Sequence, residues 1–327
     1  MNRRDFISSM AGVAAAWPCL TIAQTSSRPT IGYLDATSPA AAARFVAAFR
    51  DGLKASGYIE GQNLSIQYRW AEGEFSRLPA MAADLVKQNV TVIVSATLPA
   101  TLAAKAAAKG GIPIVFALSA DPVEFGVVSR LNNPDGNITG VTQVLGALGA
   151  KRVEILHEVA PSVRTIAILA NPTNPHGEPH TASAKSAAGK LGLQSYVLFA
   201  STPAGIDAAM TSVGERGIGA VLVSDDPLFR ISKDQLVALA AKQRVPTIYF
   251  GREFIEAGGL ISYGPHFPTL YYKVGQYTAS VLKGAKTAQL PVVQPDRFEL
   301  VINRKTAKSL RLTIPPVVIL RADEVIE

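Results

Sequence analysis

The sequence contains only one cysteine, Cys19, which excludes a framework of disulfide bonds within the chain. Charged residues are scarce at 17%, against 48% hydrophobic residues, so the chain is not intrinsically disordered and can bury a large core. The formal net charge is +7, yet there is no run of four Lys or Arg residues and no nucleic-acid reader motif. We therefore expect no nucleic-acid partner, and the length of 327 residues indicates two domains.

The common signatures of α/β enzymes are also missing. The sequence has no phosphate-binding loop, no dinucleotide glycine fingerprint and no Gly-x-Ser-x-Gly elbow. His176 and His180 flank Glu178 at a spacing that suits a metal. However, Gly177 and Pro179 predict that no regular helix forms there. We expect no metal site, no cofactor and no enzymatic activity, while an exported hydrolase stays open as an alternative.

Residues 1–23 predict an export signal peptide. Arg3 and Arg4 precede an apolar stretch over residues 10–22, and Ala23 supplies a cleavage site. The adjacent arginines favour the twin-arginine route, although the general secretory route accepts the same charge. The apolar stretch is too short to span a membrane. These features predict a periplasmic protein.

Cys19 raises lipid anchoring as an alternative location. Ala16, Trp17 and Pro18 before it lack the Leu and small-residue pattern of a lipidation site, so a lipid anchor is not expected. Cleavage after Ala23 leaves a mature chain without cysteine, which suits an oxidising compartment.

One short pattern occurs twice, 105 positions apart. The apolar run 112–118 ends in Ser119, Ala120, Asp121 and Pro122, and the apolar run 220–223 ends in Ser224, Asp225, Asp226 and Pro227. Apolar runs closed by such turn residues are typical of buried parallel strands. The repetition predicts two similar lobes that meet at equivalent strand ends.

The rest of the chain alternates strand and helix patterns, which predicts an α/β fold of two Rossmann-like lobes with parallel sheets. Further strands are expected at 31–34, 64–70, 90–94, 165–170, 194–199, 247–250, 260–263 and 298–302. The turn-rich stretch 132–140 marks the first passage between the lobes. We expect lobe 1 to comprise residues 28–140 and 257–288, and lobe 2 to comprise residues 141–256 and 289–327.

Ligands of open parallel sheets bind beyond the carboxyl ends of the strands, so candidate ligand-binding residues are sought there. Polar side chains follow five strands, and two aromatic rings lie near strand ends; the candidates are Tyr33, Thr37, Ser38, Ser95, Thr97, Ser119, Asn171, Asp226 and Tyr263. The same polar side chains suit helix caps, and the rings suit the core. Both interpretations stay open at this point.

Several motifs together resemble a known family. They are Arg3 to Ile7 with Ala14 to Pro18, Tyr58 with Glu60, Gly61 and Asn63, Arg69 to Gly73, Asp121 to Val123, Asn137 with Thr139 to Val141, Arg252 to Phe254, Gly258 to Leu260, and Ser262 to Gly264. Over the whole chain this set is similar to the substrate-binding proteins of ABC transporters related to the tryptophan and tyrosine uptake group.

The resemblance implies a periplasmic binding protein of type I, whose two lobes are joined by three crossovers and close on a solute. It places residues 95–101 and Ser119 at the carboxylate of the ligand, and Asn171 and Asp226 at its other end, with Asp226 suited to an amine. Aromatic amino acid binders carry Thr, Asp and Asn where this chain has Asp225, Asp226 and Pro227. The expected solute is small and organic, either amino-acid-like or an aromatic carboxylate.

The same resemblance implies a monomer that delivers its solute to an ABC permease with a separate ATPase subunit. A transcription regulator of this fold needs a helix-turn-helix before the first lobe, where this sequence has its export signal. An exported ligand sensor for a receptor kinase has the same sequence features, so it stays open beside transport.

Overall fold

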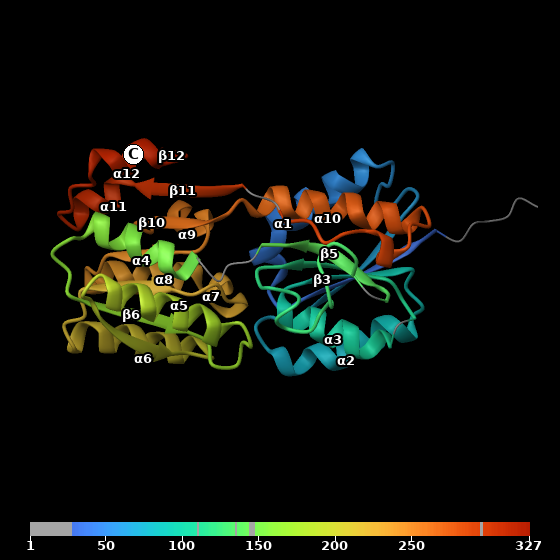
Figure 1. Cartoon of the computed structure of the whole chain (residues 1–327), viewed down its shortest axis with the longest axis horizontal. Helices are drawn as coiled ribbons and strands as arrows, with labels where there is room; N and C mark the ends of the chain where they lie inside the picture. The colour runs from blue at the N-terminus through green and yellow to red at the C-terminus, as the bar shows by residue number, and fades with distance from the viewer. Residues whose placement is uncertain (1–27, 110, 135, 144–147, 295–296) are drawn as a thin grey trace, which may run out of the picture.

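The structure is a computed structural model that describes residues 28–327, apart from 110, 135, 144–147 and 295–296. The expected signal peptide and Cys19 lie outside the described residues. Two lobes lie side by side along the long axis of the molecule (Figure 1). Each has its own sheet, which confirms the predicted α/β fold of two lobes. Within the described residues, no helix is both long and apolar enough to cross a membrane.

Lobe 1 is built on a five-stranded sheet in which every pair of neighbours is parallel. Its strands, in spatial order, are β2 (Ser65–Trp70), β1 (Thr30–Asp35), β3 (Val92–Ala96), β4 (Ile114–Leu118) and β5 (Ile138–Thr142).

Helices cover both faces of this sheet. On one face, α1 (Pro39–Ala55) and α10 (Phe267–Leu282) pack over a core that contains Ile31 and Val94. On the other, α2 (Leu78–Lys87) and α3 (Leu98–Ala108) pack over Ile93 and Phe116. Two short turns, η1 (Phe75–Arg77) and η2 (Thr287–Gln289), complete the lobe. Because both faces are covered, the central strands β3 and β4 are fully buried and largely apolar.

Lobe 2 contains a seven-stranded sheet, parallel except where β10 meets β11. The spatial order is β12 (Glu324–Ile326), β11 (Phe298–Asn303), β10 (Ile261–Pro265), β9 (Thr247–Tyr249), β8 (Ala220–Val223), β6 (Thr165–Ala170) and β7 (Gln194–Phe199).

The helices of lobe 2 also form two layers. One layer contains α6 (Pro203–Glu215), α7 (Pro227–Ile231), α8 (Lys233–Gln243) and α9 (Arg252–Glu256). The other contains α4 (Leu148–Val159), α5 (Gly177–Lys190), α11 (Arg304–Ser309) and α12 (Pro316–Arg321). Both layers bury apolar side chains against the sheet, which is the usual solution for a parallel sheet.

The crossings between the lobes differ from those expected. Residues 138–142 form β5 of the first sheet, so the first crossing follows this strand instead of lying within 132–140. Residues 261–265 form β10 of the second sheet, so the second crossing comes just before α10. Val293 donates its N–H to Gly140 O at 3.1 Å, so the third crossing follows Val293. An apolar run shows that a strand is buried but not which sheet it joins.

The expectation that Gly177 and Pro179 prevent a helix was wrong. Helix α5 begins at Gly177 and includes Pro179 in its first turn. The N–H groups of the first turn have no partner within the helix, so the missing N–H of proline has no cost there.

Two glycines allow α1 and α10 to cross at close range. A Cβ atom added to Gly52 meets Tyr272 O at 2.1 Å, and one added to Gly275 meets Phe49 O at 2.3 Å. Both contacts are to backbone oxygens, which no rotamer change relieves. This crossing fixes α10, and with it the wall of lobe 1 that faces lobe 2.

We expect Gly275→Ala to lower the free energy of unfolding by about 1–3 kcal/mol, because the new methyl group forces the two helices apart. Gly189→Ala is the matched control, since Gly189 is also helical and its Cβ position is open. The control is expected to be neutral or stabilising by up to about 1 kcal/mol. Urea titrations of both variants check this, and equal effects would contradict the close crossing.

Candidate functional site

A cavity with about 640 Å³ of space not filled by atoms lies between the two lobes. It is located at the carboxyl ends of parallel strands, where ligands of such sheets bind. Lobe 1 lines it with Asp35, Thr37, Phe45, Thr97 to Pro99, Ala117 to Ala120, Phe267, Leu270 and Tyr271, and lobe 2 with Asn174, His176, Asp225, Pro227 and Arg230.

Thr97 is the most distinctive residue on the lobe 1 wall. It directly precedes α3 and has φ +100°, a conformation that β-branched residues rarely adopt. Its Oγ1 is buried and has no hydrogen-bond partner among the described residues. The N-terminus of α3 adds partial positive charge at this point. This corner of the cavity is therefore suited to an anionic group.

Asp35 brings a carboxyl group to the same wall. It directly ends β1 and accepts hydrogen bonds from Thr37 N at 2.8 Å and Thr37 Oγ1 at 2.9 Å. Burial raises its pKa to about 6, although these bonds and the charge of Arg230 act in the opposite direction. A cationic group nearby would favour its ionised form.

On the lobe 2 side, Asp226 organises the strand ends. Its Oδ1 accepts from Leu228 N at 2.8 Å and Asn171 Nδ2 at 3.2 Å, and its Oδ2 accepts from Asn174 Nδ2 at 2.8 Å. It is the N-cap of α7, and burial raises its pKa to about 6. Its oxygens are thus used within lobe 2, and Asp226 is not part of the cavity wall.

The neighbouring carboxylate, Asp225, lies on that wall instead. One oxygen, Oδ1, lies 3.5 Å from Arg230 Nη2. The other, Oδ2, is buried without a hydrogen-bond partner among the described residues. The sequence analysis assigned direct contact with an amine to Asp226, whereas the geometry makes Asp225 the available acceptor.

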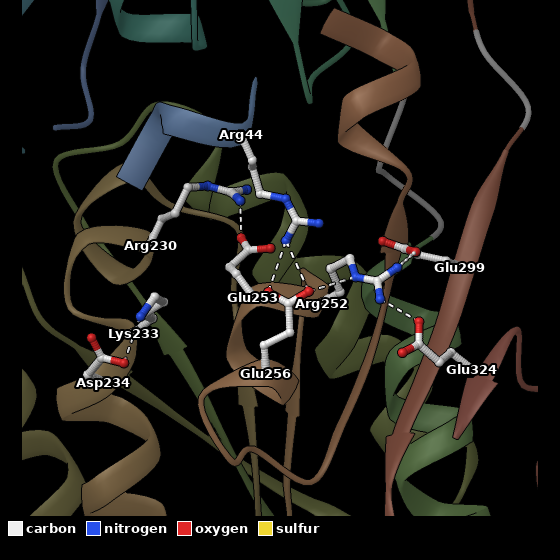
Figure 2. A network of polar contacts seen from close by, with 9 residues as sticks. All are labelled: Arg44, Arg230, Lys233, Asp234, Arg252, Glu253, Glu256, Glu299 and Glu324. Atoms are coloured by element: carbon white, nitrogen blue, oxygen red, sulfur yellow. Dashed lines mark hydrogen bonds and ion pairs between the residues drawn. The ribbon is translucent and has the colours of Figure 1, made fainter. Parts of the chain in front are cut away.

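Arg230 on α7 connects the two lobes. Its guanidinium carbon lies 4.5 Å from the ring centroid of Phe267, 5.0 Å from that of Phe45 and 4.7 Å from that of Phe250. The first two rings belong to lobe 1, and the third belongs to lobe 2. Glu253 pairs with the guanidinium (Figure 2). Burial opposes the charge of Arg230, but Glu253 and Asp225 outweigh burial and raise its pKa.

A second contact between the lobes lies at the rim (Figure 2). Arg44 Nη1 of α1 lies 3.3 Å from Glu256 Oε2 of α9. Glu256 also accepts from Arg252 Nε at 3.0 Å, and Arg252 pairs with Glu299 at 3.1 Å and with Glu324. Arg44 is the lobe 1 member of this network, so opening of the lobes breaks its pair.

The nine candidates from the sequence fall into two groups. Thr37, Thr97 and Ser119 line the cavity. The other six lie behind it or elsewhere: Ser38 caps α1, Asp226 caps α7, Ser95 bonds Thr101, Asn171 bonds Asp226, Tyr33 packs against Phe49, Tyr68 and Trp70, and Tyr263 stacks on Phe298. For Ser38 and Tyr33, the capping and core interpretations apply.

Several cavity residues were not among those candidates. Asp225 occupies the position in the repeated pattern that Ala120 occupies in the first copy, and both residues line the cavity. The repeat therefore indicated this position. Arg230 follows five positions later on a short helix that sequence patterning missed. Phe267 and Tyr271 come from α10, which reaches the site only through the second crossing. Nothing in the local sequence indicates them.

A metal is not indicated by the geometry. Within the described part of the chain, no group of three or more His, Cys, Asp or Glu residues is arranged to hold a metal ion. The site instead combines charged and hydroxyl groups with aromatic rings, which suits reversible binding of an organic molecule.

Comparisons with known proteins identify the family of this chain. The family described as ABC transporter substrate binding protein matches residues 35–326. The tyrosine-binding protein of Clostridioides difficile strain R20291 is 26% identical over 279 residues, 84% of this chain and 80% of that protein.

Two solved structures have the same fold. The ABC domain from Streptococcus pneumoniae in complex with L-Trp has a TM-score of 0.84 at 27% identity and covers 92% of this chain and 100% of that one. A conserved domain protein from Vibrio cholerae has a TM-score of 0.85 at 26% identity and covers 91% and 99%. With a family match over nearly its whole length and an interlobe cavity built for an organic solute, the chain belongs to the ABC transporter substrate-binding proteins.

Proposed function

We propose that this protein captures an amino-acid-like solute in the interlobe cavity and delivers it to a membrane permease driven by a separate ATPase. The observation that carries the proposal is Asp225, a carboxylate on the cavity wall with one oxygen free of hydrogen bonds. A buried acceptor of this kind favours a cationic donor, as an α-ammonium group provides.

The opposite wall supports the second half of such a solute. Thr97 Oγ1 and the N-terminus of α3 offer hydrogen-bond donors and partial positive charge to a carboxylate. Phe45, Phe267 and Tyr271 add apolar surface between the two polar ends. An aromatic carboxylate without an amine would leave Asp225 Oδ2 without a hydrogen-bond donor, so the amino-acid-like alternative is favoured.

Closure of the lobes provides the mechanism. A solute that contacts both walls binds the closed form better than the open form and so shifts the equilibrium toward closure. Arg230 against Phe45 and Phe267, together with the Arg44–Glu256 pair, adds contacts that exist only while the lobes are together. The closed form is then the one presented to the permease.

The location follows from the sequence. The arginine pair and apolar stretch of residues 1–23 support export, by the twin-arginine route, to the periplasm.

The related proteins support the solute class, since one is named for tyrosine and another was solved with L-Trp.

We expect Asp225→Asn to weaken binding of an L-amino acid about ten- to a hundredfold, because the charge-assisted hydrogen bond to the ammonium is lost. Calorimetric titration of a panel of L-amino acids measures this, with thermal unfolding as a check on folding. Asp207→Asn, an exposed site on α6, is the control and is expected to bind as the wild type does.

The amine itself is tested with a matched pair of ligands. The wild type is expected to bind L-phenylalanine at least about tenfold more tightly than 3-phenylpropionate, which lacks only the ammonium group. Equal affinities, or an unchanged affinity in Asp225→Asn, would overturn the assignment of Asp225.

We expect Arg44→Gln to speed solute release by up to about fivefold with little change in the association rate, since an exposed ion pair is worth about 0.2–1 kcal/mol. Stopped-flow fluorescence measures both rates. Arg304→Gln is the control, because Arg304 pairs with Glu327 within lobe 2. The same release rate in Arg44→Gln and the control would show that the rim pair does not hold the closed form.

A further inference from the structure

His176 is a buried side chain on the cavity wall with no role in the function proposed so far. It is only 7% exposed and directly precedes α5. Neither Nδ1 nor Nε2 has a hydrogen-bond partner among the described residues. Leaving buried polar atoms unpaired costs free energy, and such atoms in native proteins normally have hydrogen-bond partners. Because His176 lies on the cavity wall, a bound solute is the expected hydrogen-bond partner of its ring.

The backbone of His176 is held in place by the strand-end network. Its N–H donates to Asn174 Oδ1 at 3.1 Å, and Asn174 Nδ2 donates to Asp226 Oδ2 at 2.8 Å. The turn that carries the imidazole is therefore tied to the same aspartate that caps α7. A fixed backbone of this kind is what a recognition residue needs.

The ring is held from both lobes. Phe125 of lobe 1 approaches it edge-on, with centroids 6.1 Å apart, and His180 of lobe 2 does the same at 6.2 Å. The contact with Phe125 exists only when the lobes are together. A hydrogen bond between the ring and a solute held between the lobes would form on closure.

The neighbouring His180 does not add a positive charge beside His176, because Arg152 keeps it neutral. Arg152 is fully buried and donates to His180 Nε2 at 2.9 Å and to Tyr263 O at 2.7 Å. Since arginine only donates, His180 Nε2 is the acceptor and cannot carry a proton. Burial and the charge of Arg152 lower the pKa of His180 well below its ordinary value.

Burial lowers the pKa of His176 below its ordinary value, and the attraction of Asp225 does not offset this. This direction favours the neutral imidazole near pH 7. A neutral imidazole presents one N–H donor and one acceptor nitrogen. A carboxylate can bond only the donor nitrogen, and an ammonium can bond only the acceptor nitrogen. A hydroxyl or a carboxamide can bond either nitrogen, because each of these groups donates and accepts.

We propose that His176 is a specificity-determining residue that recognises a third polar group of the solute, an uncharged hydroxyl or carboxamide beyond its ammonium and carboxylate. The inference rests on the proposed binding of an amino-acid-like solute. Phe45, Phe267 and Tyr271 supply the apolar part of the site, and His176 supplies a hydrogen-bonding requirement that an all-apolar side chain leaves unmet.

Matched ligand pairs test this inference by titration calorimetry. L-tyrosine is compared with L-phenylalanine, and L-glutamine with L-methionine. The wild type is expected to bind the hydroxyl or amide member of at least one pair about tenfold or more tightly than its partner. In His176→Phe that ratio is expected to fall to within about threefold, because the hydrogen bond between the ring and the solute is gone.

Two further variants separate recognition from folding. His176→Gln keeps a donor and an acceptor and is expected to restore part of the ratio, whereas His157→Phe, half-buried on α4 outside the cavity, is expected to keep it whole. Binding without any preference in the wild type, or a ratio that survives in His176→Phe, would overturn the inference and leave the proposed function standing. If none of the four amino acids binds, the proposed function fails and the inference fails with it.

Discussion

The closed arrangement depends on one buried cation, Arg230. A guanidinium taken out of water is costly unless it is paired, and here Glu253 and Asp225 provide the opposite charge. Two of its three aromatic neighbours, Phe45 and Phe267, come from the other lobe. When the lobes separate, the cation loses those rings and gains water. Closure is therefore an exchange of hydration for contacts with rings, and the lobes are free to move at modest cost in either direction.

The repeated pattern shows how two similar lobes acquire different chemistry. Asp121 accepts from Val123 N at 2.8 Å, and Asp226 accepts from Leu228 N at 2.8 Å, so both aspartates shape the turn that follows their strand. The residue before each aspartate lines the cavity, and it is Ala120 in lobe 1 but Asp225 in lobe 2. A single difference within the repeat thus gives lobe 2 a carboxylate where lobe 1 has only a methyl group.

Much of the fold could be predicted because its signals are local. The apolar run 112–118 and its Asp-Pro end mark a buried parallel strand wherever they occur. The positions at which the chain crosses between the lobes were harder to predict from the sequence. β10 joins the second sheet through β9 and β11, and this pairing depends on segments far apart in the sequence. Pro179 shows a different limit, since its effect depends on its position within the helix.

By itself, the sequence determined most of the strands and the longer helices, the two-lobe architecture and the strand ends at which the cavity lies, because apolar periodicity and turn residues act over a few positions. Only the tertiary structure decided which side chains face the cavity. Asp226 is held by Asn171 and Asn174, and that leaves Asp225 on the wall. Phe267 reaches Arg230 only after the chain has crossed back to lobe 1. How deeply a side chain is buried, and which way it points, depends on how the helices and strands pack. Asp225 and Asp226 are adjacent and chemically alike, yet they differ in both respects.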